Sequence, residues 1–284
     1  MQPKSLILDL LSATDPAPIF PAAFLEAARI FRLKENTVRV ALGRLVTRGY
    51  IEDRGVGPRR RYALSPRSRI LNAHILAAQS LHPRSWNGDW ISVIAWAPGV
   101  GRRERDGLRE ALRVLKLANL QPGVWVRPDN LDLSLETVLR EYGLAEEVLW
   151  SRGPLHHGGT DAALVRRLFD IDRMARAIDR ACRALETSEK RLDTLSRERA
   201  LVETFTVGGR AIKILFDDPL LPAPLLPAGW RGHELRERFA RYDRIGRVRW
   251  REALGLAVGE RPVPAIGARA HTPLRLVAGA KEAS

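Results

Sequence analysis

Residues 21–65, PAAFLEAARIFRLKENTVRVALGRLVTRGYIEDRGVGPRRRYALS, decide the fold of the first part of this chain. They predict two short helices joined by a tight turn, the first beginning at Pro21. Apolar residues of the second helix recur at three- and four-residue spacing: Val38, Ala41, Leu42, Leu45 and Val46. This spacing predicts one apolar helix face. We expect Asn36 to cap the start of that helix and Gly49 to follow its end.

A hairpin is expected next, because residues 50–52 and 61–64 are strand-like and residues 54–60 hold two glycines and a proline. Helix, turn, helix and hairpin together predict a winged helix-turn-helix. Arg39, Arg44 and Arg48 lie off the apolar face, and Arg59, Arg60 and Arg61 crowd the hairpin. Guanidinium groups suit phosphate oxygens and the acceptor edge of guanine, so the segment is expected to bind DNA. The alternative is a small helical hairpin with a solvated basic face.

Composition agrees with an anionic partner. The chain has 284 residues, a formal net charge of +14 and a sequence pI near 10.9, which favours nucleic acid or a phosphorylated ligand. Its one cysteine, Cys182, excludes an intramolecular disulfide and an ordinary cysteine-based zinc site. Without an apolar run of membrane-spanning length or a signal-peptide core, we expect a soluble, cytoplasmic protein.

The rest of the chain predicts an α+β multidomain protein. A short helix is expected at 5–11, capped by Ser5, and another at 67–81. Strands near 90–96, 123–126 and 147–150 alternate with helices at 102–117 and 133–142, which suggests a ferredoxin-like module. One long helix is expected from Asp161 past Leu185, then a second at 189–205 that residues 207–209 interrupt. A last helix is expected at 232–254, after an extended proline-rich segment at 217–230.

These segments define four expected parts. They are a winged helix-turn-helix domain (1–83), a ferredoxin-like middle domain (84–158), a helical C-terminal domain for effector binding or dimerisation (159–258), and a flexible tail (259–284).

Two stretches carry a resemblance to a known family. The stretch TVRVALGRLVTRGYIEDR (residues 37–54) and the stretch DPLLPAPLLPAGWRG (218–232) are similar to motifs of the PaaX family, repressors of phenylacetic acid degradation operons. The resemblance implies a dimeric bacterial transcriptional repressor, released from operator DNA by an aryl-acyl-coenzyme A effector such as phenylacetyl-coenzyme A. It places DNA contacts on Thr37, Arg39, Arg44 and Arg48 and on the wing, whose basic residues are Arg54, Arg59, Arg60 and Arg61. The residues that bind the effector stay unknown.

The sequence gives weaker support for other functional sites. His156 and His157 have no third ligand at suitable spacing, so we expect a surface loop, no metal site and no cofactor beyond the effector. The turn at 99–101 resembles a phosphate-binding turn but is more simply a strand-to-helix connection. One alternative function is a metal-dependent nuclease built on the ferredoxin-like module, although residues 96–98 offer no acidic ligand after the first strand. Another is a non-specific basic protein that coats DNA.

Overall fold

The computed structural model describes residues 1–80, 83–95, 102–132, 134–144 and 148–255. It is an α+β structure, as predicted. Contacts divide these residues into two units. Unit 1 holds 1–80, 162–218 and 224–255, and unit 2 holds the described part of 83–161 together with 219–223. The expected tail and the glycine turn at 99–101 lie outside the described residues.

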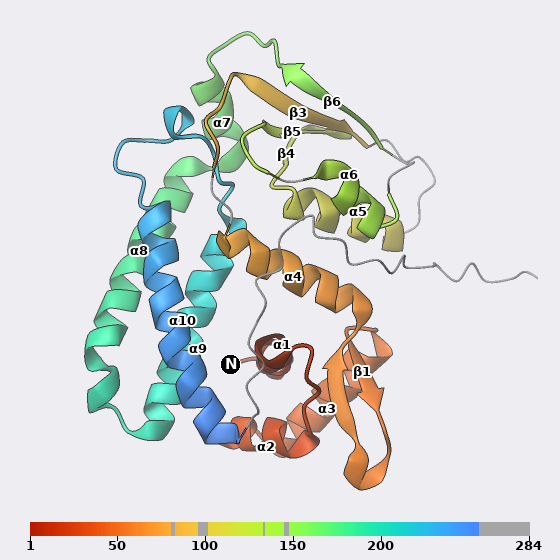
Figure 1. The fold of residues 1–284 in the computed structure, drawn as a ribbon, viewed down its shortest axis with the longest axis vertical. Helices are drawn as coiled ribbons and strands as arrows, with labels where there is room; N and C mark the ends of the chain where they lie inside the picture. Colours follow the sequence, from red (N-terminus) through yellow and green to blue (C-terminus); the bar gives the residue numbers. More distant parts are fainter. Residues whose placement is uncertain (81–82, 96–101, 133, 145–147, 256–284) are drawn as a thin grey trace, which may run out of the picture. The chain divides into compact units, whose positions relative to one another are not determined.

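Unit 1 combines the first part of the chain with the helices near its end (Figure 1). Its elements are α1 (Pro3–Thr14), α2 (Pro21–Ile30), α3 (Glu35–Thr47), β1 (Ile51–Arg54), η1 (Gly57–Arg59), β2 (Arg61–Leu64), α4 (Pro66–Ser80), α7 (Asp161–Phe169), α8 (Ile171–Arg191), η2 (Leu192–Thr194), α9 (Arg197–Asp217), η3 (Ala223–Leu225) and α10 (Gly232–Leu254). None of the helices in the described ranges is both long enough and apolar enough to span a membrane.

The first core of unit 1 lies under α3. Val38, Leu42 and Leu45 of α3 are buried against a cluster that α1 supplies with Leu6, Ile7, Leu10 and Leu11. The predicted apolar face is therefore correct. Two predicted caps are wrong, because α1 begins at Pro3 after Gln2, and α3 begins at Glu35 after Lys34, with no side-chain cap at either. Gly49 does follow the end of α3, with φ +70°.

The second core of unit 1 lies among α8, α9 and α10, which pack on one another (Figure 1). The single long helix predicted from Asp161 is wrong, because Asp170 is left-handed (φ +47°) and separates α7 from α8. Apolar periodicity continues across the break, and aspartate tolerates this conformation. The helix predicted at 189–205 begins instead at Arg197 and continues through Gly208 and Gly209. A Cβ on Gly208 would lie 3.8 Å from the ring of Tyr242, which is an ordinary van der Waals distance.

Unit 2 is a four-stranded antiparallel sheet with two helices. Its elements are β3 (Asp89–Ile94), α5 (Arg102–Val114), β4 (Ala118–Gln121), β5 (Val124–Pro128), α6 (Leu135–Glu141) and β6 (Leu149–Pro154). The strand order is β4-β5-β3-β6 and each neighbouring pair is antiparallel. This βαββαβ connectivity is ferredoxin-like. The sequence predicted three strands and missed β4, whose four residues, ANLQ, lack a β-rich pattern.

A buried arginine organises unit 2. Arg127 on β5 is 2% exposed and donates hydrogen bonds to the carbonyls of Pro128 and Leu115 and to Asn130 Oδ1, at 2.9, 3.1 and 2.7 Å. Burial lowers its pKa to about 9, which still leaves it charged at pH 7. Asn130 in turn donates to the carbonyl of Leu220 at 2.9 Å. The segment 219–223 is therefore held in unit 2 by a chain of buried hydrogen bonds.

The proline-rich motif at 218–232 has its other anchor in unit 1. Asp218 is almost fully buried and pairs with Arg236 of α10 at 2.5 Å. Gly232, the first residue of α10, is pressed between Trp230 and this carboxylate. A Cβ at position 232 would lie 2.5 Å from Trp230 Nε1 and 3.1 Å from Asp218 Oδ2. The motif thus places an aspartate and a tryptophan close against the same glycine.

We expect Gly232→Ala to destabilise the protein by about 1–3 kcal/mol, because the added methyl group forces a tightly packed site apart. Urea unfolding followed by circular dichroism measures the change. Gly209→Ala is the matched control, since a Cβ there meets no atom within 4 Å and alanine is the better helix former by up to about 1 kcal/mol. Equal stability of Gly232→Ala and wild type would contradict the close packing.

Candidate nucleic-acid interface

The exposed face of α3 is the first part of the candidate interface. Thr37, Arg39, Arg44 and Arg48 all lie exposed on this helix or at its C-cap, outside the buried face of Val38, Leu42 and Leu45. The buried face packs on α1. The predicted site residues of this helix are therefore all free to meet a ligand, on a rigid support.

The charges on this face differ in how they are paired. Arg39 lies 3.8 Å from Glu35, and both side chains are more than 60% exposed, so water screens the pair strongly. Arg44 and Arg48 form no ion pair or side-chain hydrogen bond with any residue that the structure describes. Their guanidinium groups keep all their donors available for an incoming anion.

The β1–β2 hairpin is the second part. Its strands pair antiparallel from Ile51–Leu64 to Arg54–Arg61. The connection turns at Gly55, which has φ +76° and whose Cβ would lie 2.7 Å from the carbonyl of Arg59. Only glycine fits that turn without strain. The predicted loop is therefore correct in position and chemistry.

The predicted basic residues of the hairpin are exposed, but they are not equally free. Arg54 donates to Glu52 at 2.6 and 3.0 Å, and Arg60 binds Asp53. Arg61 lies over the ring of Phe20, 4.7 Å from its centroid. Arg59 has no ion-pair partner in the described part of the chain. The wing cations thus divide into one free guanidinium and three that are held in place.

Tyr62 shows that helix and hairpin converge. It packs edge-on against Phe24, with ring centroids 6.0 Å apart, and Arg60 lies 5.6 Å from its ring centroid. Burial raises the pKa of Tyr62, while the positive charges of Arg60 and, more weakly, Arg39 oppose the rise. A charge from α3 and a charge from the connection between β1 and β2 therefore act on the same side chain.

Sequence reasoning missed three features of this face. Val40 is 45% exposed beside the arginines of α3, and Gly43 meets no atom within 4 Å of a Cβ position. An exposed valine can contact a thymine methyl group, and a glycine lets a ligand backbone approach. Lys4 of α1 lies over the ring of Tyr50, 4.6 Å from its centroid. Val40 could have been found as the apolar residue outside the buried periodicity.

The histidine pair does not assemble a metal site among the residues described. His157 Nε2 lies 3.0 Å from Asp161 Oδ1. Within the described ranges, no three or more histidine, cysteine, aspartate or glutamate side chains are grouped so that they could hold a metal ion. His157 and Asp161 therefore form a local contact at the start of α7.

Comparison with known proteins identifies the family. The family model described as PaaX protein central Cas2-like domain matches residues 83–165, and the one described as PaaX-like protein C-terminal domain matches residues 169–249. Together they cover more than half of the chain, which belongs to the PaaX family.

Two individual proteins are similar to the chain at 26% and 28% sequence identity. The chain is 26% identical over 214 residues to the transcriptional repressor PaaX of Escherichia coli (strain K12), covering 72% of this chain and 66%, just under two thirds, of that protein. A solved structure, the uncharacterized protein Rv0674 from Mycobacterium tuberculosis, is 28% identical with a TM-score of 0.55. That comparison covers 87% of this chain and 97% of the other.

We expect Gly55→Ala to cost about 1–3 kcal/mol of stability, because alanine is strained at φ +76° and its methyl group collides with the carbonyl of Arg59. Thermal unfolding measures the loss. Val56→Ala is the control for the same loop: its side chain is 84% exposed, so its effect should stay within about 0.5 kcal/mol. If the two variants behave alike, the turn at Gly55 does not need glycine.

Proposed function

We propose that the chain is a sequence-specific DNA-binding transcriptional regulator, and a repressor rather than an enzyme. The observation that carries this proposal is the exposed face of α3, where Arg44 and Arg48 stand unpaired on a helix supported by α1. An α-helix of this kind fits the major groove. The similarity to the Escherichia coli repressor supports the same function.

In this proposal, residues 1–83 are a winged helix-turn-helix. Helix α3 enters the major groove, where Arg39 and Arg44 read base edges and Thr37 and Arg48 contact the nearby backbone. The hairpin is the wing. Arg59, Arg60 and Arg61 bind phosphates, while Arg54 supports the strand through Glu52. The net charge of +14 adds a sequence-independent attraction to DNA.

We further propose a cytoplasmic homodimer on a near-palindromic operator, with its two recognition helices about 34 Å apart or a multiple of that distance. The regulated genes would encode the breakdown of an aromatic acid such as phenylacetate. An aryl-acyl-coenzyme A would act as effector by favouring a geometry in which the helices no longer match the groove spacing. Support for these finer points comes from the family motifs at 37–54 and 218–232.

Arginine substitutions on α3 test whether Arg39 and Arg44 recognise the DNA bases. We expect Arg39→Ala and Arg44→Ala each to weaken operator binding about tenfold or more and to reduce discrimination between operator and random DNA. Arg59→Ala should weaken both DNAs alike and lower the salt slope by about 1. Fluorescence anisotropy at several salt concentrations measures these effects, with Arg54→Ala as the control already paired to Glu52. Full discrimination in both α3 variants would exclude this helix as the reader.

A footprint tests the effector. At fixed salt, we expect discrete protection on DNA upstream of the gene for this protein or its neighbours, lost on addition of phenylacetyl-coenzyme A or a related thioester. Protection that no thioester removes would keep the repressor and reject this effector class. Salt-sensitive binding along the DNA with no discrete protected region would favour the non-specific DNA-binding alternative.

A further inference from the structure

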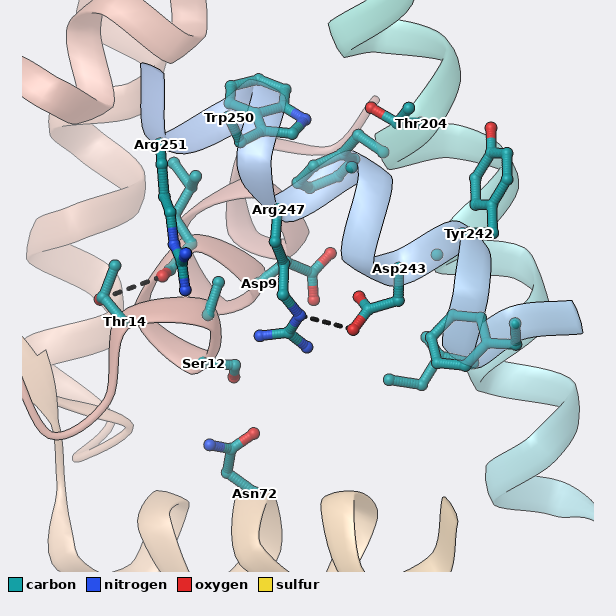
Figure 2. Close-up of a pocket in the computed structure, with 18 residues that line it drawn as sticks. Asp9, Ser12, Thr14, Asn72, Thr204, Tyr242, Asp243, Arg247, Trp250 and Arg251 are labelled. Carbon is teal, nitrogen blue, oxygen red and sulfur yellow. Dashed lines mark hydrogen bonds and ion pairs between the residues drawn. The ribbon is translucent and has the colours of Figure 1, made fainter. Parts of the chain in front are cut away.

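Unit 1 contains a cavity of about 170 Å³ outside the DNA-binding face. Figure 2 shows its lining, which comes from α1 and α4 on one side and α9 and α10 on the other. All four helices belong to the same unit. The cavity therefore lies where the first part of the chain meets its last helices.

The walls suit a flat apolar group. Phe205, Phe239 and Trp250 contribute aromatic surface, and Gly208 and Gly209 leave room along α9. An apolar cavity of about 150 Å³ is known to hold benzene, so this volume admits one aromatic ring with a short substituent. It has no space for a whole coenzyme.

Two guanidinium groups give the cavity an anion-binding edge. Arg247 and Arg251 extend from α10 toward α1 (Figure 2). Arg247 uses its Nε to bind Asp243, which leaves its terminal nitrogens available. Arg251 has no ion-pair partner among the residues that the structure describes. A guanidinium fork matches a carboxylate in shape and charge.

Asp9 of α1 faces this edge, and its carboxylate opposes an anion when it is ionised. Burial among the walls raises its pKa to about 6, although its side chain stays open to water that enters the cavity. That access limits how far the shift can go. Asp243, Arg247 and Arg251 are the other charged groups of the lining. With a pKa of about 6, Asp9 is mostly ionised at pH 7, where these four charges cancel. Its protonation below about pH 6 leaves one net positive charge for a ligand.

The cavity is connected by packing to the proposed DNA-binding helices. Trp250 stacks on Phe31, the C-cap of α2, with ring centroids 5.9 Å apart and planes 9° apart. Phe205 meets both rings edge-on, at 5.1 and 5.7 Å. On the other side, Leu10 of α1 lines the cavity and belongs to the core under α3. A ligand in this cavity therefore contacts Trp250, which packs on α2, and Leu10, which belongs to the core under α3.

We propose that this cavity is a regulatory site for a small aromatic acid, with the ring between Phe205, Phe239 and Trp250 and the acid oxygens bound by Arg247 and Arg251. The same aryl-acyl group can arrive as a free carboxylate or as a thioester. Paired arginines favour the free carboxylate. The regulatory part of this inference rests on the proposed function, because it assigns the release of DNA to changes in the packing of α1 and α2.

Tryptophan fluorescence of the full chain without DNA tests the site, with phenylacetate as the probe. We expect a saturable change that is lost in Trp250→Phe. The neutral isostere phenylacetamide should bind about tenfold more weakly or worse, because it lacks the charge for the arginine pair. Arg251→Gln should weaken phenylacetate to a similar degree. Arg244→Gln is the control: it removes a charge from an exposed position of α10 outside the cavity.

Two substitutions of Gly209 that differ in side-chain size give an independent measurement. Gly209→Leu should weaken binding by occupying the cavity, whereas Gly209→Ala should keep it, and circular dichroism verifies that both variants fold. Phenylacetyl-coenzyme A is titrated alongside phenylacetate. Weakening of either compound in both Arg251→Gln and Gly209→Leu supports the cavity, and the compound that binds identifies the source. Binding unchanged in both variants, or no saturable binding of either compound near 1 mM, the weak end of specific recognition, overturns the proposal.

Operator binding in the same variants separates this inference from the proposed function. We expect Arg251→Gln to bind operator normally without ligand and to resist release when ligand is added, since binding and release are thermodynamically linked. Normal operator binding with no cavity ligand would reject the inference and leave the regulator. Ligand binding without specific DNA binding would reject the regulator and its control by this site.

Discussion

The contact on which unit 1 depends is the aromatic cluster of Phe31, Phe205 and Trp250. It joins residues that lie more than 170 positions apart in the sequence, and it makes the first helices and the last helices one hydrophobic body. Aromatic pairs of this geometry contribute about 0.5–1.5 kcal/mol each beyond the apolar area they bury. Without the cluster, α2 would keep only its packing on α1, α3 and Tyr62 of the hairpin among these contacts, and the cavity would lose the wall formed by Trp250.

The arginines of α3 and of the β1–β2 hairpin differ in whether an acidic side chain pairs with them. The net charge of +14 does not show this difference. Arg54 is bound to Glu52 of its own hairpin and so supports the strand. Arg60 uses Nε and one terminal nitrogen on Asp53, whereas Arg44 and Arg59 keep all their donors for a partner. The buried Arg127 cannot contact a partner directly, because it is enclosed in unit 2 and donates its hydrogen bonds there. Counting arginines therefore overestimates how many are available to an anionic partner.

Local patterns predicted the fold where one face of an element is buried. The apolar face of α3, the hairpin at Gly55 and the last helix from Gly232 all follow from periodicity and turn chemistry. Prediction failed at two places along the helices: Asp170 breaks a continuous apolar pattern, and α9 continues through Gly208 and Gly209, where the glycines predicted an interruption. The cavity could not be predicted at all, since its lining residues come from four helices and share no motif.

The hydrogen bond from Asn130 to Leu220 has a consequence for the order in which the protein is made. Its two partners are 90 residues apart, so at about 5–20 residues per second a ribosome needs roughly 5–20 s to synthesise the second after the first. From residue 154 onward all strands and helices of unit 2 have been synthesised, but Asn130 still lacks its acceptor until Leu220 follows. Unit 2 therefore emerges with an open polar position that only a much later segment of the nascent chain closes.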